Sequence, residues 1–171
     1  MAEKESKMRA WISGLIGAFL LVALAVLPAP AVNDCGKDLN VRFEKELIVL
    51  INAQREKNGL VLLTLQSQLK TLARAHCADM ACNGHSSHTA SDGSSTRDRV
   101  TAQGYQFVAV GENIAAGCEA PREVIALWMN SPGHRKNMLD PSFTEMGAGY
   151  LYDPKSKYLS YWTVIFGYPL K

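Results

Sequence analysis

The sequence predicts an α+β domain in which helices pack on a small antiparallel sheet. Two stretches between residues 40 and 81 repeat apolar residues at the helical period. From residue 145 the apolar pattern changes to the two-residue period of strands. Helices therefore come mainly first and strands mainly last. This order is typical of α+β folds rather than of alternating α/β folds.

The first half of the chain predicts two long helices. Residues 40–58 carry one apolar stripe at helical spacing, formed by Phe43, Leu47, Leu50 and Ile51. Asn58-Gly59 then offers an ending suited to a left-handed cap. A second helix is expected from about Ser67 to Ala81, because a similar apolar face recurs there, and Asn83-Gly84 ends it.

The middle of the chain predicts a loop and short helical segments. Residues 84–96 are rich in Ser, Thr, Gly and His, which is typical of an exposed loop, and a helical turn is expected around 97–103. Pro121 suits the first position of a further helix. That helix should stop at Ser131, because the next residue is a proline. A new turn can then begin with Ser131 as N-cap and Pro132 at the first position.

The last part of the chain predicts a β-hairpin. Residues 145–152 show a period of two, with Met146, Ala148, Tyr150 and Tyr152 alternating with Gly147, Gly149 and Leu151. Asp153-Pro154-Lys155-Ser156 then makes a turn. Residues 158–167 form the expected partner strand. A third strand near 107–114 would complete a small sheet.

The N-terminal segment predicts export. Residues 10–27 contain no charged residue, and Ala29-x-Ala31 has the spacing of a signal-peptidase site, so residues 1–31 are interpreted as a cleaved signal peptide. An uncleaved signal anchor is the alternative, because this run reaches the lower limit for spanning a bilayer. Only that alternative would bring the protein to a membrane. Residues 32–43 then form a lead-in to the domain. In both cases the domain lies outside the cytoplasm, secreted, periplasmic or at the cell surface.

Charge and cysteine content narrow the function class further. A formal net charge of +2 argues against a nucleic-acid binder, which normally carries a clear basic excess. Four cysteines in an exported chain suggest two disulfides. Five helical positions would separate Cys77 from Cys82 by about 140° around the axis, which disfavours a bond between them. Each would then pair, in one order or the other, with Cys35 or Cys118.

Three residues could carry chemistry. His134 would be the third residue of a short helix, where the helix dipole favours a neutral ring suited to metal binding or proton transfer. His88 follows His85 at a spacing that can share a metal, although this spacing is common by chance. Glu112 lies in an apolar run, where a carboxylate must be paired or functional. A surface turn for His134 and a structural role for Glu112 are the simpler alternatives. His76, on an apolar helix face, is expected to be a hydrogen-bonded core residue.

Longer motifs around these residues give a family resemblance. The matching segments are Ser87-His88-Thr89, Asp92-Gly93-Ser94, Asp98-Arg99, Gly111 to Gly117, Trp128 to Asn137 and Phe143 to Gly149. Over roughly residues 44–168 the chain resembles the bacterial branch of the CAP superfamily (cysteine-rich secretory proteins, antigen 5 and pathogenesis-related proteins), also called the SCP domain. The resemblance implies an α-β-α sandwich, with a small antiparallel sheet between helical layers and a central cleft.

The resemblance also implies a site. His88, Glu112 and His134 match three cleft residues that hold Zn²⁺ or another divalent ion in some members of the family. The family's second acidic position is Ser131 here, which removes one carboxylate. Ser131 and Asn113 are expected to line the cleft. Two His and one carboxylate still fit an open zinc site with a free position.

Three functions remain open from sequence. The first is an exported binding module whose cleft holds a divalent ion and an extracellular ligand, which the resemblance suggests is a lipid or sterol, a glycan or a protein. The second is a metal-dependent or Glu112-assisted hydrolase, with Ser131 as an alternative nucleophile. Neither Gly-x-Ser-x-Gly nor His-Glu-x-x-His is present to support it. The third is an inert extracellular scaffold in which Glu112 only fixes an imidazole.

Overall fold

The computed structural model describes residues 39–170, so the expected signal segment 1–31 and most of the lead-in lie outside the described residues. The described part contains five helices and four strands. In chain order they are α1 (Val41–Lys57), β1 (Thr64–Leu65), α2 (Ser67–Asn83), α3 (Thr96–Ala102), β2 (Phe107–Ala116), α4 (Pro121–Asn130), α5 (Pro132–Met138), β3 (Glu145–Tyr152) and β4 (Ser160–Pro169).

The strands form one sheet with the order β1-β3-β4-β2. The three long strands pair antiparallel, with Glu112 of β2 opposite Ile165 of β4 and Ala148 of β3 opposite Val164. The two-residue strand β1 pairs parallel with β3, so the sheet is mixed rather than purely antiparallel as expected. Strand β2 lies at one edge of this sheet, which leaves one side of its backbone open to side chains from other elements.

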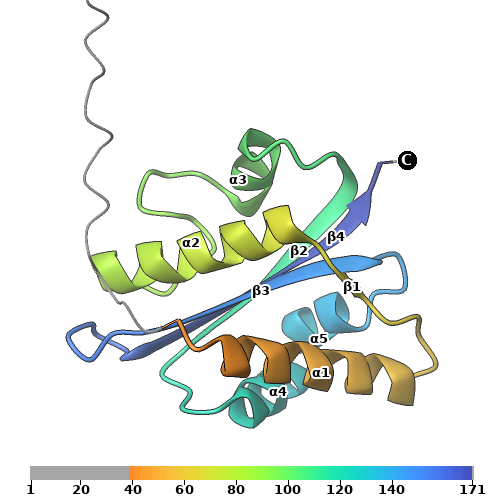
Figure 1. Cartoon of the computed structure of the whole chain (residues 1–171), viewed down its shortest axis with the longest axis horizontal. Coiled ribbons are helices and arrows are strands. Elements are labelled where there is room, and N and C mark those ends of the chain that lie inside the picture. The colour runs from red at the N-terminus through yellow and green to blue at the C-terminus, as the bar shows by residue number, and fades with distance from the viewer. Residues whose placement is uncertain (1–38, 171) are drawn as a thin grey trace, which may run out of the picture. The chain divides into compact units, whose positions relative to one another are not determined.

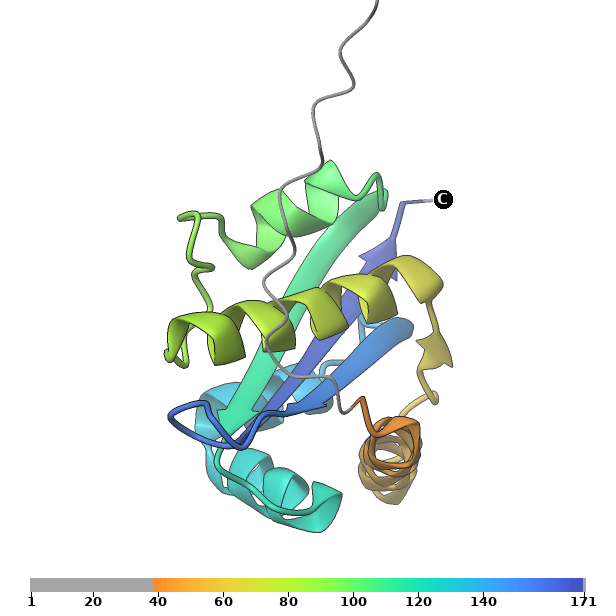
Figure 2. The ribbon, with the colours of Figure 1, turned by 60° about the vertical axis from the view of Figure 1, so that its left-hand side comes forward.

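The helices cover the two faces of the sheet. Figures 1 and 2 show α2 and α3 on one face and α1, α4 and α5 on the other, the three-layer α-β-α arrangement. Helix α2 lies directly on β3, because the strand presents Gly147 and Gly149 to it. A Cβ atom at Gly147 would overlap the backbone of Lys70 in α2. The alternation in β3 therefore reflects two different faces, one against a helix backbone and one against large side chains.

The apolar core is split by the sheet. On the α1 and α4 face it includes Leu47, Trp128, Tyr150 and Trp162, all buried. Two smaller clusters lie beneath α2, one around Leu69 and the other around Met80. Because apolar clusters cover both faces of the sheet, the strand β4 carries an almost continuous run of buried residues.

The predicted elements agree with the structure to within a few residues, and one local detail differs. Gly84 takes the expected left-handed conformation at the end of α2, with φ of 63°. Ser131 and Pro132 occupy the expected N-cap and first positions of α5. The Ser131 side chain makes no capping hydrogen bond, however, so the capping role inferred for its hydroxyl is wrong.

The prediction of two disulfides is also wrong. Cys77 and Cys118 both carry free thiols. Cys77 points from α2 into the core beneath it, where its thiol donates to Oγ1 of Thr163 at 3.3 Å. Cys118 packs against the core on the other face of the sheet, so the two cannot meet. Cys35 lies outside the described residues, and Cys82 is not among the free thiols.

Candidate functional site

Three separate elements bring the predicted site residues together. His88 lies in the loop between α2 and α3, Glu112 in the middle of β2, and His134 at the third position of α5. Nδ1 of His88 lies 2.8 Å from Oε1 of Glu112. The ring centroids of His88 and His134 are 6.5 Å apart, with their planes tilted by 41°. The site therefore forms at the edge strand of the sheet, between the two helical layers.

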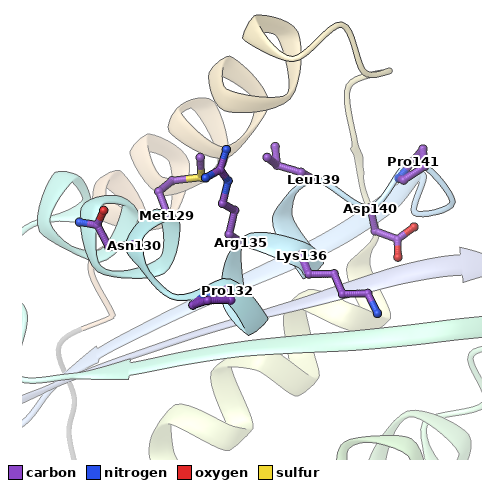
Figure 3. A pocket seen from close by; sticks show the side chains of 8 residues that line it. All are labelled: Met129, Asn130, Pro132, Arg135, Lys136, Leu139, Asp140 and Pro141. Atoms are coloured by element: carbon purple, nitrogen blue, oxygen red, sulfur yellow. The ribbon is translucent and has the colours of Figure 1, made fainter.

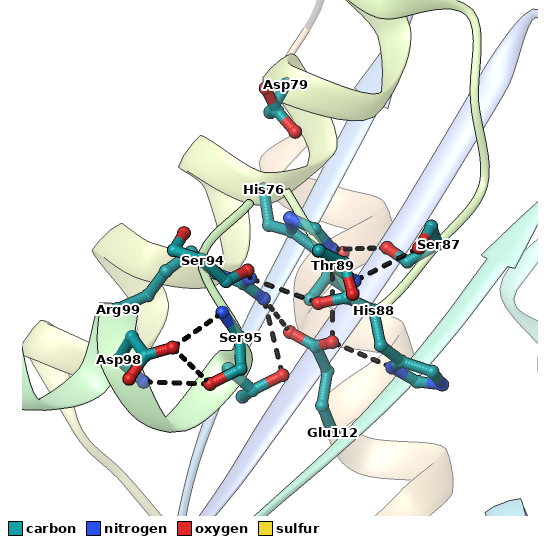
Figure 4. Close-up of polar contacts among 12 residues, drawn as sticks. His76, Asp79, Ser87, His88, Thr89, Ser94, Ser95, Asp98, Arg99 and Glu112 are labelled. Carbon is teal, nitrogen blue, oxygen red and sulfur yellow. Dashed lines mark hydrogen bonds and ion pairs between the residues drawn. The ribbon is translucent and has the colours of Figure 1, made fainter. Parts of the chain in front are cut away.

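Glu112 is the centre of the polar cluster, and Figure 4 shows it between the His88 ring and the Arg99 side chain. Its side chain is only 2% exposed, and its second oxygen, Oε2, accepts a hydrogen bond from Nη2 of Arg99 at 2.7 Å. Burial acts to raise the pKa of Glu112, but the hydrogen bond from His88 and the nearby positive charges outweigh it, so the pKa falls below the usual value. Glu112 is therefore an ionised carboxylate with both oxygens engaged.

Arg99, on α3, is a site residue that the sequence analysis did not single out. Its Nη1 donates to the main-chain oxygens of His88 (3.1 Å) and Ser94 (3.0 Å), in addition to the bond from Nη2 to Glu112. A buried carboxylate requires a compensating charge, and that rule could have directed attention to the Asp98-Arg99 motif. Arg99 ties the His88 loop to the edge strand.

His76 confirms the prediction of a hydrogen-bonded core residue. It is 1% exposed, and its Nε2 lies 2.9 Å from the main-chain oxygen of Ser87. Since a carbonyl only accepts, Nε2 must carry the proton. The same nitrogen lies 3.9 Å from Oε1 of Glu112. Burial lowers the pKa of His76, which favours a neutral ring. His76 thus supports the residue immediately before His88.

His134 packs between an indole and the other imidazole. Its ring centroid lies 6.3 Å from that of Trp128 on α4. Burial, followed by repulsion from His88, lowers the pKa of His134, so the ring is neutral at pH 7. The direction agrees with the sequence expectation, but the main cause is burial rather than the helix N-terminus. Nδ1 of His134 is buried and has no hydrogen-bond partner among residues 39–170.

Asn113 does not line the cleft as expected. Its side chain is fully buried on the α5 side of β2, where Nδ2 donates to the main-chain oxygen of His134 at 2.9 Å. Asn137 of α5 donates to Oδ1 of Asn113 (2.9 Å) and to the main-chain oxygen of Glu112 (3.0 Å). The two amides hold α5, and with it His134, against the strand that carries Glu112.

Ser131 shows no catalytic pairing. Among the described contacts, no hydrogen bond joins its hydroxyl to His134, the base that a serine nucleophile would need. His85 is also separate from the cluster, because its Nε2 lies 3.5 Å from Oδ2 of Asp79. His85 and His88 are therefore engaged by different carboxylates.

A surface hollow lies away from these residues. A shallow cavity of about 520 Å³ opens beside α4 and α5 (Figure 3), with none of the three site residues in its wall. A second hollow, of about 300 Å³, adjoins it between α1 and α4, and Met129 lines both. Within the His-Glu-His cluster, the His88 side chain is exposed and the Glu112 side chain is buried.

The three-ligand metal site expected from sequence does not fit the geometry. Over residues 39–170, no group of three or more His, Cys, Asp and Glu residues is arranged to hold a metal ion. The reason is that Glu112 gives one oxygen to His88 and the other to Arg99. The rings of His88 and His134 lie beside each other, with Glu112 behind His88. Carboxylates commonly occupy this position behind metal-binding histidines.

Comparisons with known proteins match most of the described chain. The model of the cysteine-rich secretory protein family (CAP) matches residues 48–166. The uncharacterized protein YkwD of Bacillus subtilis (strain 168) is 41% identical over 109 residues, which cover 64% of this chain and 42% of that protein. The uncharacterized membrane protein YlbC of the same strain is 31% identical over 124 residues, which cover 72% of this chain and 36% of that protein. The chain spans less than half the length of both relatives.

Solved structures show the same fold. An extracellular protein containing an SCP domain from Bacillus anthracis str. Ames superposes with a TM-score of 0.67 at 32% identity, over 74% of this chain and 40% of that one. An outer surface protein from Borrelia burgdorferi gives a TM-score of 0.73 at 23% identity, over 79% of this chain and 99% of that one. Within residues 39–170, none of the helices has the length and apolar character that a bilayer-spanning helix requires.

Proposed function

Because the chain belongs to the cysteine-rich secretory protein (CAP) family, in its bacterial branch, we propose that it is an exported binding module that contacts its ligand through the imidazoles of His88 and His134. One observation carries this proposal: both oxygens of the buried Glu112 are already engaged by His88 and Arg99. A carboxylate held in this way orients a ring; it is not free to take a proton from water. The extracellular SCP-domain protein at 32% identity supports export.

The two imidazoles suit a divalent ion such as Zn²⁺. His88 is 54% exposed at its side chain and uses Nδ1 for Glu112, which leaves the Nε2 lone pair of the neutral ring available to a metal ion. His134 is neutral because its pKa is lowered. When bound, the ion would supply a positively charged anchor with open positions for an extracellular ligand. The two rings would hold it, while Glu112 and Arg99 would orient His88.

Hydrolysis is the weaker alternative. A general base needs a pKa near the working pH, whereas the pKa of Glu112 is lowered. A serine nucleophile needs an adjacent base, and Ser131 has no hydrogen bond to His134 among the described contacts. The engagement of both Glu112 oxygens therefore favours binding over turnover.

Calorimetric titration of Zn²⁺ into metal-stripped, tag-free protein tests the proposal. We expect one binding event for the wild type and its loss in the double variant His88→Ala/His134→Ala. The matched control is His85→Ala, because His85 lies in the same loop and contacts Asp79 instead of Glu112. Equal zinc binding by the wild type and the double variant would reject the proposal. Native mass spectrometry of protein purified without chelator then identifies the small molecule that remains bound.

A further inference from the structure

The half-exposed His88 is restrained at its ring and at its main chain independently. Its Nδ1 lies 2.8 Å from Oε1 of Glu112, while its main-chain oxygen accepts from Nη1 of Arg99 at 3.1 Å. The preceding carbonyl, of Ser87, is held by His76 at 2.9 Å. A histidine that only filled a surface turn would not need three restraints from two helices and a strand.

The partner of Nδ1 decides where the His88 proton lies. Oε2 of Glu112 accepts from the guanidinium of Arg99 at 2.7 Å, and a carboxylate paired in this way offers its other oxygen, Oε1, only as an acceptor. Nδ1 must therefore be the donor. In a neutral ring the other nitrogen, Nε2, then carries a lone pair. The ring is thereby prepared to accept a hydrogen bond or to bind an ion through Nε2.

Arg99 contacts both parts of this arrangement. We propose that Arg99 is the positioning residue of the site: it holds Oε2 of Glu112 and the main-chain oxygen of His88 at once, and so fixes the neutral His88 ring as its Nδ1–H tautomer. The identity of the ligand that the ring binds rests on the function proposed above. The tautomer assignment is independent of that function. Arg99 contacts no ligand in this assignment and acts through Glu112.

The shape of the guanidinium explains why an arginine is required. Its two terminal nitrogens reach separate acceptors on β2 and on the loop, and its side chain is 12% exposed. A lysine offers one nitrogen and cannot span both acceptors in a fixed geometry. Without the second contact, Glu112 can rotate its carboxylate away from Nδ1, and the loop loses the donor that holds His88.

The tautomer can be measured without any metal. Long-range ¹H–¹⁵N correlation spectra of the intact ¹⁵N-labelled, metal-stripped protein distinguish a protonated from an unprotonated ring nitrogen, and a pH series identifies the spectrum of the neutral ring. In the neutral ring of wild-type His88 we expect a protonated Nδ1 and an unprotonated Nε2. In Arg99→Lys and Arg99→Gln we expect loss of this preference and the appearance of Nε2–H signals. Arg97→Gln is the matched control, because Arg97 lies on the same helix and covers Phe107 instead, 5.0 Å from its ring centre.

Several outcomes would overturn the assignment. They are a neutral wild-type His88 ring protonated on Nε2, unchanged His88 signals in both Arg99 variants, or an equal change in Arg97→Gln. Unfolding of both Arg99 variants would also reject it, because Arg99 would then be needed for the fold itself. A folded Lys variant with an altered tautomer separates positioning from a merely structural role.

Zinc affinity gives a second readout. Loss of a group behind a metal-binding histidine weakens metal binding by roughly 10-fold to 100-fold, so we expect at least about a tenfold loss in Arg99→Lys. Unaltered zinc affinity in a variant with an altered tautomer would contradict the positioning role. If the wild type shows the expected tautomer but binds no zinc, the function proposed above fails while the tautomer assignment stands.

Discussion

Nη2 of Arg99 lies 2.7 Å from Oε2 of Glu112, and this contact joins helix α3 to the edge strand β2. Its consequence is that the carboxylate expected to be a metal ligand instead lies behind His88. The site is therefore better described as two imidazoles on a supported loop and helix than as three equivalent ligands.

Replacing Glu112 by Gln should lower stability most at neutral pH. The variant keeps the size of the side chain but loses two charge-assisted hydrogen bonds, and we expect a loss of about 1–3 kcal/mol at pH 7. The pKa of Glu112 is lower in the folded protein than its ordinary value of 4.5, so the folded state binds the proton less readily than the unfolded state. The wild-type advantage is therefore present above pH 4.5 and disappears as the pH falls through the lowered pKa.

Urea unfolding of both proteins between pH 7 and pH 3 measures this advantage. Asp92, Asp98 and Asp140 also have lowered pKa values, so both proteins should lose stability in acid. Only the difference between them isolates Glu112. A difference that stays constant, or grows on acidification, would contradict the ionised and paired state of this carboxylate.

Gly147→Ala should destabilise the fold strongly. The added Cβ would overlap the backbone of Lys70, which cannot move aside as a side chain can. Overpacking typically costs about 1–3 kcal/mol, and a backbone clash belongs at or above the upper end of that range. The matched control is Gly133→Ala, where a Cβ meets nothing within 4 Å. Thermal unfolding compares the two, and equal melting temperatures would contradict the close contact between α2 and β3.

Much of this arrangement could be predicted from sequence because it depends on local patterns. The apolar stripe around Leu47 marked α1, and the alternation of Met146 and Ala148 with glycines marked β3. His88, Glu112 and His134 were found through their flanking motifs. Arg99 was missed because its role in the site depends on a long-range contact with Glu112, and no local sequence pattern indicates such a contact.

The predictions for Ser131, Asn113 and the disulfides were wrong because they too depend on the three-dimensional surroundings of these residues. Ser131 has the sequence context of a capping residue, but its backbone alone occupies the cap position. Asn113 follows Glu112 directly, so its side chain points to the opposite face of the strand and is buried against α5. An even number of cysteines suggested two disulfides, whereas the sheet separates Cys77 from Cys118.

The two free thiols should differ in reactivity. Burial raises the pKa of Cys77 to about 12, so its thiolate is scarce and inaccessible at neutral pH. Cys118 is partly exposed, and burial raises its pKa as well. We expect iodoacetamide to label Cys118 slowly in the native protein and to label Cys77 only after unfolding without reductant. Peptide mass spectrometry locates the labels, and a disulfide at either cysteine would contradict the structure.

The central claim is that ligand binding uses the His88 and His134 rings while Glu112 stays behind His88. Anomalous X-ray diffraction at the zinc edge, on metal-stripped crystals soaked with Zn²⁺, tests it most directly. We expect a zinc peak at about 2.1 Å from Nε2 of His88 and from the His134 ring, with Glu112 still hydrogen-bonded to Nδ1 of His88. Zinc held by the Glu112 carboxylate, or bound at other residues only, would contradict it.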